Sequence, residues 1–318
     1  MRCSLGPPTH DNLAPVVRNV AWWLPTLALM VGLPIHAAEG WSDALEARCW
    51  AQFVKARTAS DRSDGTRSVG FANIRDGMNV YSPFRVEFAI RGMGVVPAGK
   101  PHAAAGHHHI LIDTKLPVDV QASMPFNDKY VHFGKGQTFA TLNLAPGRRT
   151  LRLLFADHEH RPYYIFSREV TVNVIGPRSS LLSTGSPRVT QARFDESCRA
   201  WFDNVTTEPT PAATPAYFQN VRSGDAVRSP FVLKFGAEGY GVCASDVDAE
   251  GTGHFQIEVL RRDRVERKVV LADGQTQYEF DLEPGGYEFR LTLVDRRGKV
   301  LGPPDLVSMK VIAAASGK

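Results

Sequence analysis

The chain has 318 residues, with 37 lysines and arginines against 33 aspartates and glutamates, which gives a formal net charge of +4. Hydrophobic residues make up 43% of the chain and charged residues 22%, as in ordinary globular proteins, so a disordered, collagen-like or coiled-coil chain is excluded. This net charge is too small for the length to indicate nucleic acid as a partner. At this length we expect two domains.

The N-terminal segment, residues 1–38, has the layout of a secretory signal peptide. Arg18 precedes an apolar run that starts at Val20 and is broken by Pro25, and small residues end the segment. The run is shorter than the roughly 20 residues that a membrane-spanning helix needs. We therefore predict cleavage near Ala38, a periplasmic or secreted mature protein, and no membrane span after cleavage.

Three cysteines follow the predicted cleavage site: Cys49, Cys198 and Cys243. In an oxidising compartment, an odd number allows one disulfide within the chain and leaves one thiol over. The sequence leaves several arrangements open. Cys198 can pair with Cys49 or with Cys243, or each cysteine can be a small buried side chain.

The chain contains an internal repeat, in which one sequence unit occurs twice. Residues 71–84 match residues 218–231 at an offset of 147, and the match runs without a gap to His107 and His254. It resumes after a nine-residue deletion in the second copy. Two copies of one unit indicate two domains.

The domain boundaries follow from this repeat. The predicted segments are a first repeat over residues 39–176, a linker over 177–191 that is rich in Ser, Pro and Gly, and a second repeat over 192–318. A further extended linker, residues 206–215, lies within the second repeat.

Each copy contains short apolar–polar alternations separated by Gly, Pro and Asp, which indicate β-strands, as at residues 84–88 and 231–235. Ahead of each series lies a short amphipathic stretch, residues 41–53 and 194–202, which predicts a helix. The expected fold is all-β. It consists of two tandem immunoglobulin-like β-sandwich domains, each preceded by a short helix.

The histidines are the strongest candidates for a functional site, because neutral imidazole is the commonest metal ligand and suits zinc or copper. His107, His108 and His109 lie in one predicted strand. His108 shares the core side of that strand with Ile110, so His107 and His109 point the other way. His132 follows in a loop. If the strand at residues 151–155 continues past Asp157, then His158 and His160 project together from its outward side.

The second copy keeps only part of this set. His107 is retained as His254, whereas Gln256, Arg296 and Gly298 replace His109, His158 and His160, and His132 falls within the deleted segment. This pattern favours a functional site in the first copy and a purely structural role for the second copy. The alternative is that the first copy simply tolerates polar residues in its loops.

At these residues the chain resembles a bacterial secreted domain family of unknown function. The family pattern is found at the segments Asn73 to Pro83, Gly92 to Gly99, Gly106 to Asp113, His132 to Thr138, and Asp157 to Tyr163. Tyr163 stands where family members usually carry a second histidine. The likeness covers residues 71–174, and residues 218–312 resemble a degenerate member. It implies export and a compact β fold, and it supplies no activity or ligand.

Three functions are compatible with these patterns. The first is a periplasmic metal-binding module for copper or zinc. Its preferred ligands are His109, His132 and His160, and His107 and His158 are alternative candidate ligands. In that reading Asp113 or Asp157 orients a ring. The second is a non-catalytic module of the cell envelope that binds a protein or a glycan. The third is a metal-dependent hydrolase, which we rank last because no His-Glu-x-x-His or Gly-x-Ser-x-Gly motif is present.

Overall fold

The computed structural model describes residues 44–60, 67–178 and 187–313. The predicted signal peptide, residues 1–38, lies outside the described residues, as does part of the predicted linker 177–191. Among the described helices, none is both long enough and apolar enough to cross a membrane.

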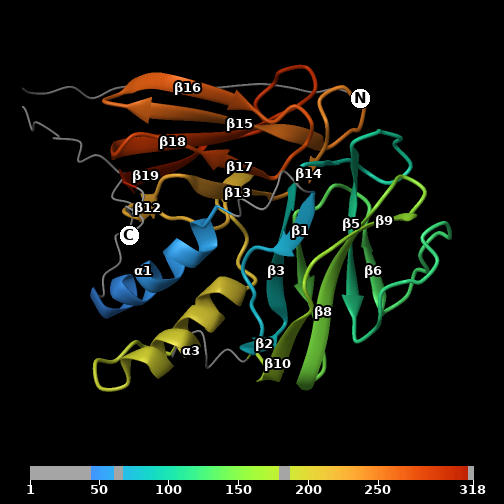
Figure 1. The fold of residues 1–318 in the computed structure, drawn as a ribbon, viewed down its shortest axis with the longest axis horizontal. Helices are drawn as coiled ribbons and strands as arrows, with labels where there is room; N and C mark the ends of the chain where they lie inside the picture. Colours follow the sequence, from blue (N-terminus) through green and yellow to red (C-terminus); the bar gives the residue numbers. More distant parts are fainter. Residues whose placement is uncertain (1–43, 61–66, 179–186, 314–318) are drawn as a thin grey trace, which may run out of the picture. The chain divides into compact units, whose positions relative to one another are not determined.

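The described strands of the first copy form two sheets (Figure 1). The smaller sheet has the order β1-β3-β7, with β1 at Ser68–Phe71, β3 at Phe84–Arg91 and β7 at Phe139–Leu142. The larger sheet has the order β2-β10-β8-β5-β4, with β6 paired to β5 and β9 paired to β8. Its strands are β2 (Met78–Ser82), β4 (Gly94–Val95), β5 (Ala105–Ile112), β6 (Tyr130–Phe133), β8 (Gly147–Ala156), β9 (Pro162–Phe166) and β10 (Val170–Pro177).

The second copy repeats this topology (Figure 1). Its smaller sheet has the order β11-β13-β17, and its larger sheet has the order β12-β19-β18-β15-β14 with β16 paired to β15. The smaller sheet contains β11 (Ala216–Phe218), β13 (Phe231–Ala237) and β17 (Gln277–Phe280). The larger contains β12 (Ala226–Arg228), β14 (Gly241–Val242), β15 (Thr252–Arg261), β16 (Arg264–Val270), β18 (Gly285–Val294) and β19 (Asp305–Ile312).

The core of each copy lies between its two sheets. In the first copy the ring of Phe88, on β3, lies 5.1 Å from that of Phe133, on β6. In the second copy Phe235, on β13, lies 5.6 Å from Phe255, on β15. All four rings are buried, and burial of side chains this large is the main source of stability for a two-sheet fold. The prediction of two immunoglobulin-like β-sandwiches is confirmed.

The two predicted helices are present, and each packs on the sandwich of the other copy. Helix α1 (Ala44–Thr58) precedes the first copy but contacts β12 and β13 of the second, whereas α3 (Phe194–Thr207) contacts β2 and β3 of the first. The indole of Trp50 on α1 donates a hydrogen bond to Asp225, 2.8 Å away in the second copy. Asp203 on α3 accepts one from Arg75 in the first copy at 2.5 Å.

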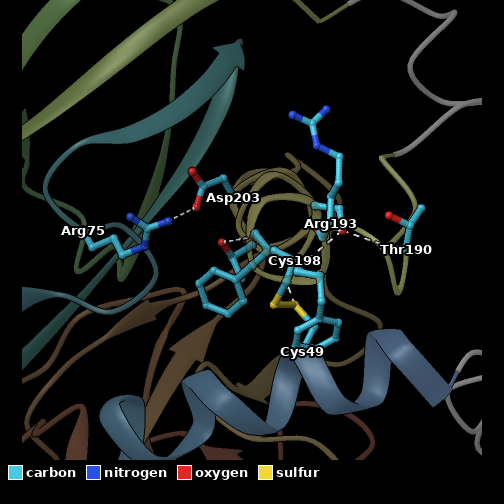
Figure 2. The surroundings of a disulfide bond; sticks show 10 residues. Cys49, Arg75, Thr190, Arg193, Cys198 and Asp203 are labelled. Carbon is cyan, nitrogen blue, oxygen red and sulfur yellow. Dashed lines mark hydrogen bonds and ion pairs between the residues drawn. A yellow bond between two sulfur atoms is a disulfide. The ribbon is translucent and has the colours of Figure 1, made fainter.

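A disulfide joins the two helices. Cys49 of α1 and Cys198 of α3 are bonded, with their Cα atoms 5.4 Å apart (Figure 2). Beside them, the rings of Phe53 and Phe202 stack with centroids 3.8 Å apart. The pairing left open by the sequence is therefore Cys49 with Cys198, and Cys243 is a buried free thiol.

Equivalent groups of the two copies also contact each other reciprocally. Two backbone bonds of 2.8 Å join Val95 to Gly274 and Val242 to Gly136. A second pair of bonds, both 2.9 Å, joins the amide of Ile90 to the Thr276 hydroxyl and the amide of Ala237 to the Thr138 hydroxyl. Because the partners in each pair occupy corresponding positions in the repeat, the copies face each other with the same surface, as two subunits of a symmetric dimer do.

Candidate metal centre

Strand β5 carries three consecutive histidines, all of them buried. Side chains alternate across a strand, so His108 points to the opposite face from its two neighbours. Its ring lies between Phe88 and Phe155, with centroids 5.1 and 5.0 Å away. The expectation that His108 is a core residue is confirmed. Burial lowers the pKa of His108 to about 3, against the opposing effect of a backbone hydrogen bond with Gln137.

His107 and His109 face the other side of β5, as the alternation predicts. Their Nε2 atoms lie 3.1 Å apart, and their ring centroids are separated by 4.9 Å. Both rings are fully buried. Two imidazole nitrogens therefore converge from one strand.

The third ring, that of His132, comes from strand β6, so the expectation that this residue lies in a loop is wrong. Strand β6 pairs with β5 in antiparallel register. His132 is directly opposite His109, so the two side chains emerge on the same face of the sheet. In the second copy the same register places Val270 opposite Gln256. His132 thus has a counterpart in that copy, and the expectation that it falls in a deleted segment is wrong.

The fourth ring, that of His160, comes from the turn between β8 and β9. Strand β8 ends at Ala156, so the expected continuation of the alternation past Asp157 does not occur. Asp157 instead folds the turn, and its Oδ1 accepts hydrogen bonds of 2.8 Å from the backbone amides of Glu159 and Arg161. His160 has a left-handed backbone conformation, with φ of 66°. The turn brings its Nε2 to 3.2 Å from Nε2 of His132.

These four rings form one cluster, which we call the histidine cluster: His107, His109, His132 and His160. The ring of His107 lies 4.8 Å from that of His132 and 5.0 Å from that of His160. One nitrogen from each of these three residues lies within 4.8 Å of the others. His109 adjoins this triad through its close contact with His107.

The spacing of the nitrogens matches what a tetrahedral metal ion needs. With metal–nitrogen bonds of about 2.0–2.1 Å, two ligands of a tetrahedral zinc ion lie about 3.3 Å apart. The Nε2 pairs of the cluster are separated by 3.1 and 3.2 Å. Among the described residues, His107, His132 and His160 are the group that could hold a metal ion, and His109 lies beside them.

The electrostatic environment lowers the pKa of three rings of the cluster, those of His107, His109 and His132. Burial, together with the neighbouring His132 and His160, lowers the pKa of His107 to about 3. Burial lowers the pKa of His109 to about 2, with further lowering by the neighbouring rings, of which His107 has the largest effect. The pKa of His132 is also lowered, first by burial and then by His160. Neutral imidazole is the form that binds metals, so His107 and His109 are in the binding form at neutral pH.

The remaining predicted site residues lie apart from the cluster. The imidazole of His158 makes no ring contact or hydrogen bond with another described residue. Asp113 lies at the far end of β5 from His107, and its carboxylate binds the Thr150 amide at 2.8 Å and Arg149 at 3.0 Å. Asp157 acts on His160 through the backbone of the turn. Neither aspartate bonds to a ring of the cluster, and the Nδ1 atoms of His107 and His109 have no hydrogen-bond partner among the described residues.

Three further residues shape the cluster or its surroundings. Phe126 is 61% exposed, and its ring covers His160 and His132 with centroids 4.8 and 5.1 Å away. A Cβ atom at Gly134 would lie 2.2 Å from the His132 ring, so a larger residue there would displace this ring. Tyr163 donates its hydroxyl to the Ala105 carbonyl at 3.0 Å. Gly134 falls within a motif of the sequence, whereas no sequence pattern identifies Phe126.

The fold and the site together define a duplicated β-sandwich protein with a cluster of buried and half-buried histidines in one copy. The chain belongs to the family described as Domain of unknown function (DUF4399), which matches it twice, over residues 86–175 and 233–313. These stretches cover more than half of the chain and confirm that the family domain is duplicated. A search of curated proteins found no match.

Solved structures with some likeness to the chain include fibronectin(III)-like modules of CbhA from Clostridium thermocellum. That match has 13% identity, covers 79% of this chain and 97% of the other, and has a TM-score of 0.23. CopC from Methylosinus trichosporium OB3b matches at 16% identity over 32% of this chain and 99% of its own, with a TM-score of 0.21. A two-domain fibronectin type-III segment of chicken tenascin matches at 10% identity over 74% and 98%, also at 0.21. Scores of this size add nothing to the account of the site.

Proposed function

We propose that the protein is exported and binds one copper or zinc ion through His107, His132 and His160, with His109 as the fourth ligand. The observation that carries this proposal is the convergence of four imidazoles from two strands and a turn. Buried polar atoms are normally satisfied, and in the described part of the chain these Nε2 atoms contact one another in pairs. A bound ion would replace these contacts with stronger bonds.

Export is part of the same proposal. It is supported by the signal-like segment at residues 1–38 and by the disulfide between Cys49 and Cys198, since such bonds persist in oxidising compartments. An all-nitrogen site also suits such a compartment, because imidazoles, unlike thiolates, are not consumed by oxidation.

Binding is favoured over hydrolysis. A hydrolytic metal site keeps one position open for water and usually places a carboxylate near it as general base. Among the described residues no carboxylate bonds to a ring of the histidine cluster. Four imidazoles also fill a tetrahedral shell. The site is therefore suited to holding or carrying an ion.

A second candidate function is a non-catalytic interaction module for an envelope protein or glycan. It is supported by large exposed apolar side chains on the first copy, which include Phe126 at 61%, Tyr164 at 51% and Phe166 at 40%. Exposed aromatic groups of this kind are common in binding surfaces. This function is compatible with metal binding, since Phe126 contacts the cluster.

Calorimetric titration of the metal-free mature protein with Zn²⁺ and Cu²⁺ tests the first proposal. We expect one ion per chain, and at least a tenfold loss of affinity in His132→Ala and in His160→Ala. His158→Ala is the matched control, because this histidine belongs to the same turn but lies outside the cluster. Absence of binding by the unaltered protein, or equal affinities in all three variants, would reject the proposal.

A further inference from the structure

A second candidate site lies away from the histidine cluster, where the helices meet the two copies. It is a cavity of about 350 Å³ between the end of α1, strand β3, and the segment that runs from the end of α3 through β11. The walls relevant here are formed by Trp50, Arg57, Arg85, Glu87, Gln219 and Arg222. Its volume is within the range of small-molecule sites.

Arg57, in the last turn of α1, has unused hydrogen-bond donors in this cavity. Its Nη2 donates to the Gln219 carbonyl, whereas its Nε and Nη1 are buried and have no partner among the described residues. Burial lowers the pKa of Arg57 to about 10, against the opposing effects of Glu87 and Asp225. The guanidinium is still protonated at neutral pH. A buried charged group with unsatisfied donors is costly unless a ligand or water binds it.

The carboxylates near Arg57 are committed to other partners. Asp225 accepts hydrogen bonds of 2.8 Å from the Trp50 indole and from the Arg222 amide. Glu87 accepts one from Arg85 at 3.3 Å. Neither carboxylate hydrogen-bonds the Arg57 guanidinium, so among the described residues its Nε and Nη1 are left available for a ligand.

A second guanidinium lies nearby. Arg222 stacks over the Trp50 ring at 3.9 Å from the centroid, and Arg57 lies 5.1 Å from the same ring. Burial and the nearby Arg57 both lower the pKa of Arg222, to about 10. Two guanidinium groups on one indole form a cationic end of the cavity, which suits an oxyanion.

The cavity also offers an unused acceptor. The side-chain oxygen of Gln219, Oε1, is buried and has no partner among the described residues. Its side-chain nitrogen, in contrast, lies 3.4 Å from the Phe88 carbonyl oxygen. A ligand that satisfies both unused groups needs an oxyanion for Arg57 and a donor for Gln219. With Arg57, Arg85 and Arg222 in the walls, a neutral hydroxyl is a better donor than an ammonium.

We propose that this cavity binds a small hydroxycarboxylate, with its carboxylate on Arg57 and its hydroxyl on Oε1 of Gln219. The aromatic face of Trp50 and the aliphatic side chains of Val205 and Val221 provide the apolar part of the walls. The site is separate from the histidine cluster, so this proposal does not depend on the proposed metal binding.

Calorimetric titration of the oxidised mature protein with L-malate, succinate and inorganic phosphate tests this proposal. Succinate has the same carbon chain and carboxylates as malate but no hydroxyl. We expect malate to bind at millimolar concentration or below, and several times more tightly than succinate or phosphate. Arg57→Gln should weaken malate binding at least tenfold. The control Arg297→Gln, at an exposed turn, should leave it unchanged.

Gln219→Met provides a second variant in case Arg57→Gln fails to fold. It should remove the preference for malate over succinate while leaving succinate binding as it is. The proposal is overturned if malate does not bind at millimolar concentration, if phosphate binds as tightly as malate, or if the preference for malate survives Gln219→Met.

Discussion

Replacement of Gly134 by alanine tests the geometry of the histidine cluster without removing any ligand. A Cβ atom at this position would lie 2.2 Å from Cε1 and 2.4 Å from Nε2 of His132, and 2.9 Å from the Cβ of Ala98. Ordinary contacts begin near 3.4 Å, so the imidazole of His132 has to move by about 1 Å. The backbone at Gly134 is not in the left-handed region, so alanine adds only this steric conflict.

The expected cost follows from the length of a metal–nitrogen bond. A displacement of about 1 Å is half of the roughly 2.0 Å bond, so His132 can no longer complete the shell in its present position. Loss of ligand positioning typically weakens metal binding 10- to 100-fold. We therefore expect Gly134→Ala to weaken Zn²⁺ or Cu²⁺ binding by about 1.4–2.8 kcal/mol.

The assay is competitive metal titration, with Gly70→Ala as the matched control. Gly70 lies in β1, and a Cβ atom there meets no other atom within 4 Å. The circular dichroism spectra of both variants should match that of the unaltered protein. If Gly134→Ala folds normally and binds metal as tightly as Gly70→Ala, the reasoning about His132 is refuted.

Three further predictions concern stability and reactivity. The disulfide between Cys49 and Cys198 closes a loop of 149 residues, which corresponds to about 5 kcal/mol of stabilisation in the chain-entropy model. We expect the variant with serine at both positions to lose about 2–5 kcal/mol in its free energy of unfolding, measured with urea. An unchanged urea midpoint would contradict this. Burial raises the pKa of Cys243 to about 11, so little of this thiol is in the reactive thiolate form at pH 8. We expect Ellman's reagent to leave Cys243 unlabelled until the protein is unfolded. Rapid labelling of Cys243 in the native protein would contradict this. Thr138→Val and Thr276→Val each remove one of two equivalent hydrogen bonds between the copies and leave a buried amide unpaired. Each substitution should lower the free energy of unfolding by about 1–3 kcal/mol. A loss of stability in only one of the two variants would refute the equivalence.

The sequence predicted the repeated unit and its strands well, because the relevant signals are local. The alternation around His108 correctly placed it in the core and His107 and His109 on the opposite face. The amphipathic stretches correctly predicted the two helices that carry Cys49 and Cys198. These outcomes depend only on the periodicity of strands and helices.

The features that the sequence could not supply depend on contacts between distant segments. An amphipathic pattern shows that a helix buries one face, but it does not show which copy covers that face, so the exchange of α1 and α3 was not predicted. The position of His160 depends on where β8 ends and on the turn folded by Asp157. Alternation alone therefore grouped it with His158. The donors of Arg57 are left unpaired only because Asp225 and Glu87 bind elsewhere.

X-ray absorption spectroscopy of the metal-loaded mature protein tests the central claim most directly, because it reports the atoms bound to the ion. The account predicts one ion per chain, surrounded by imidazole nitrogens at about 2.0–2.1 Å. A protein that retains no ion after dialysis, or a shell with sulfur at about 2.3 Å, would contradict the assignment of the histidine cluster as the metal site.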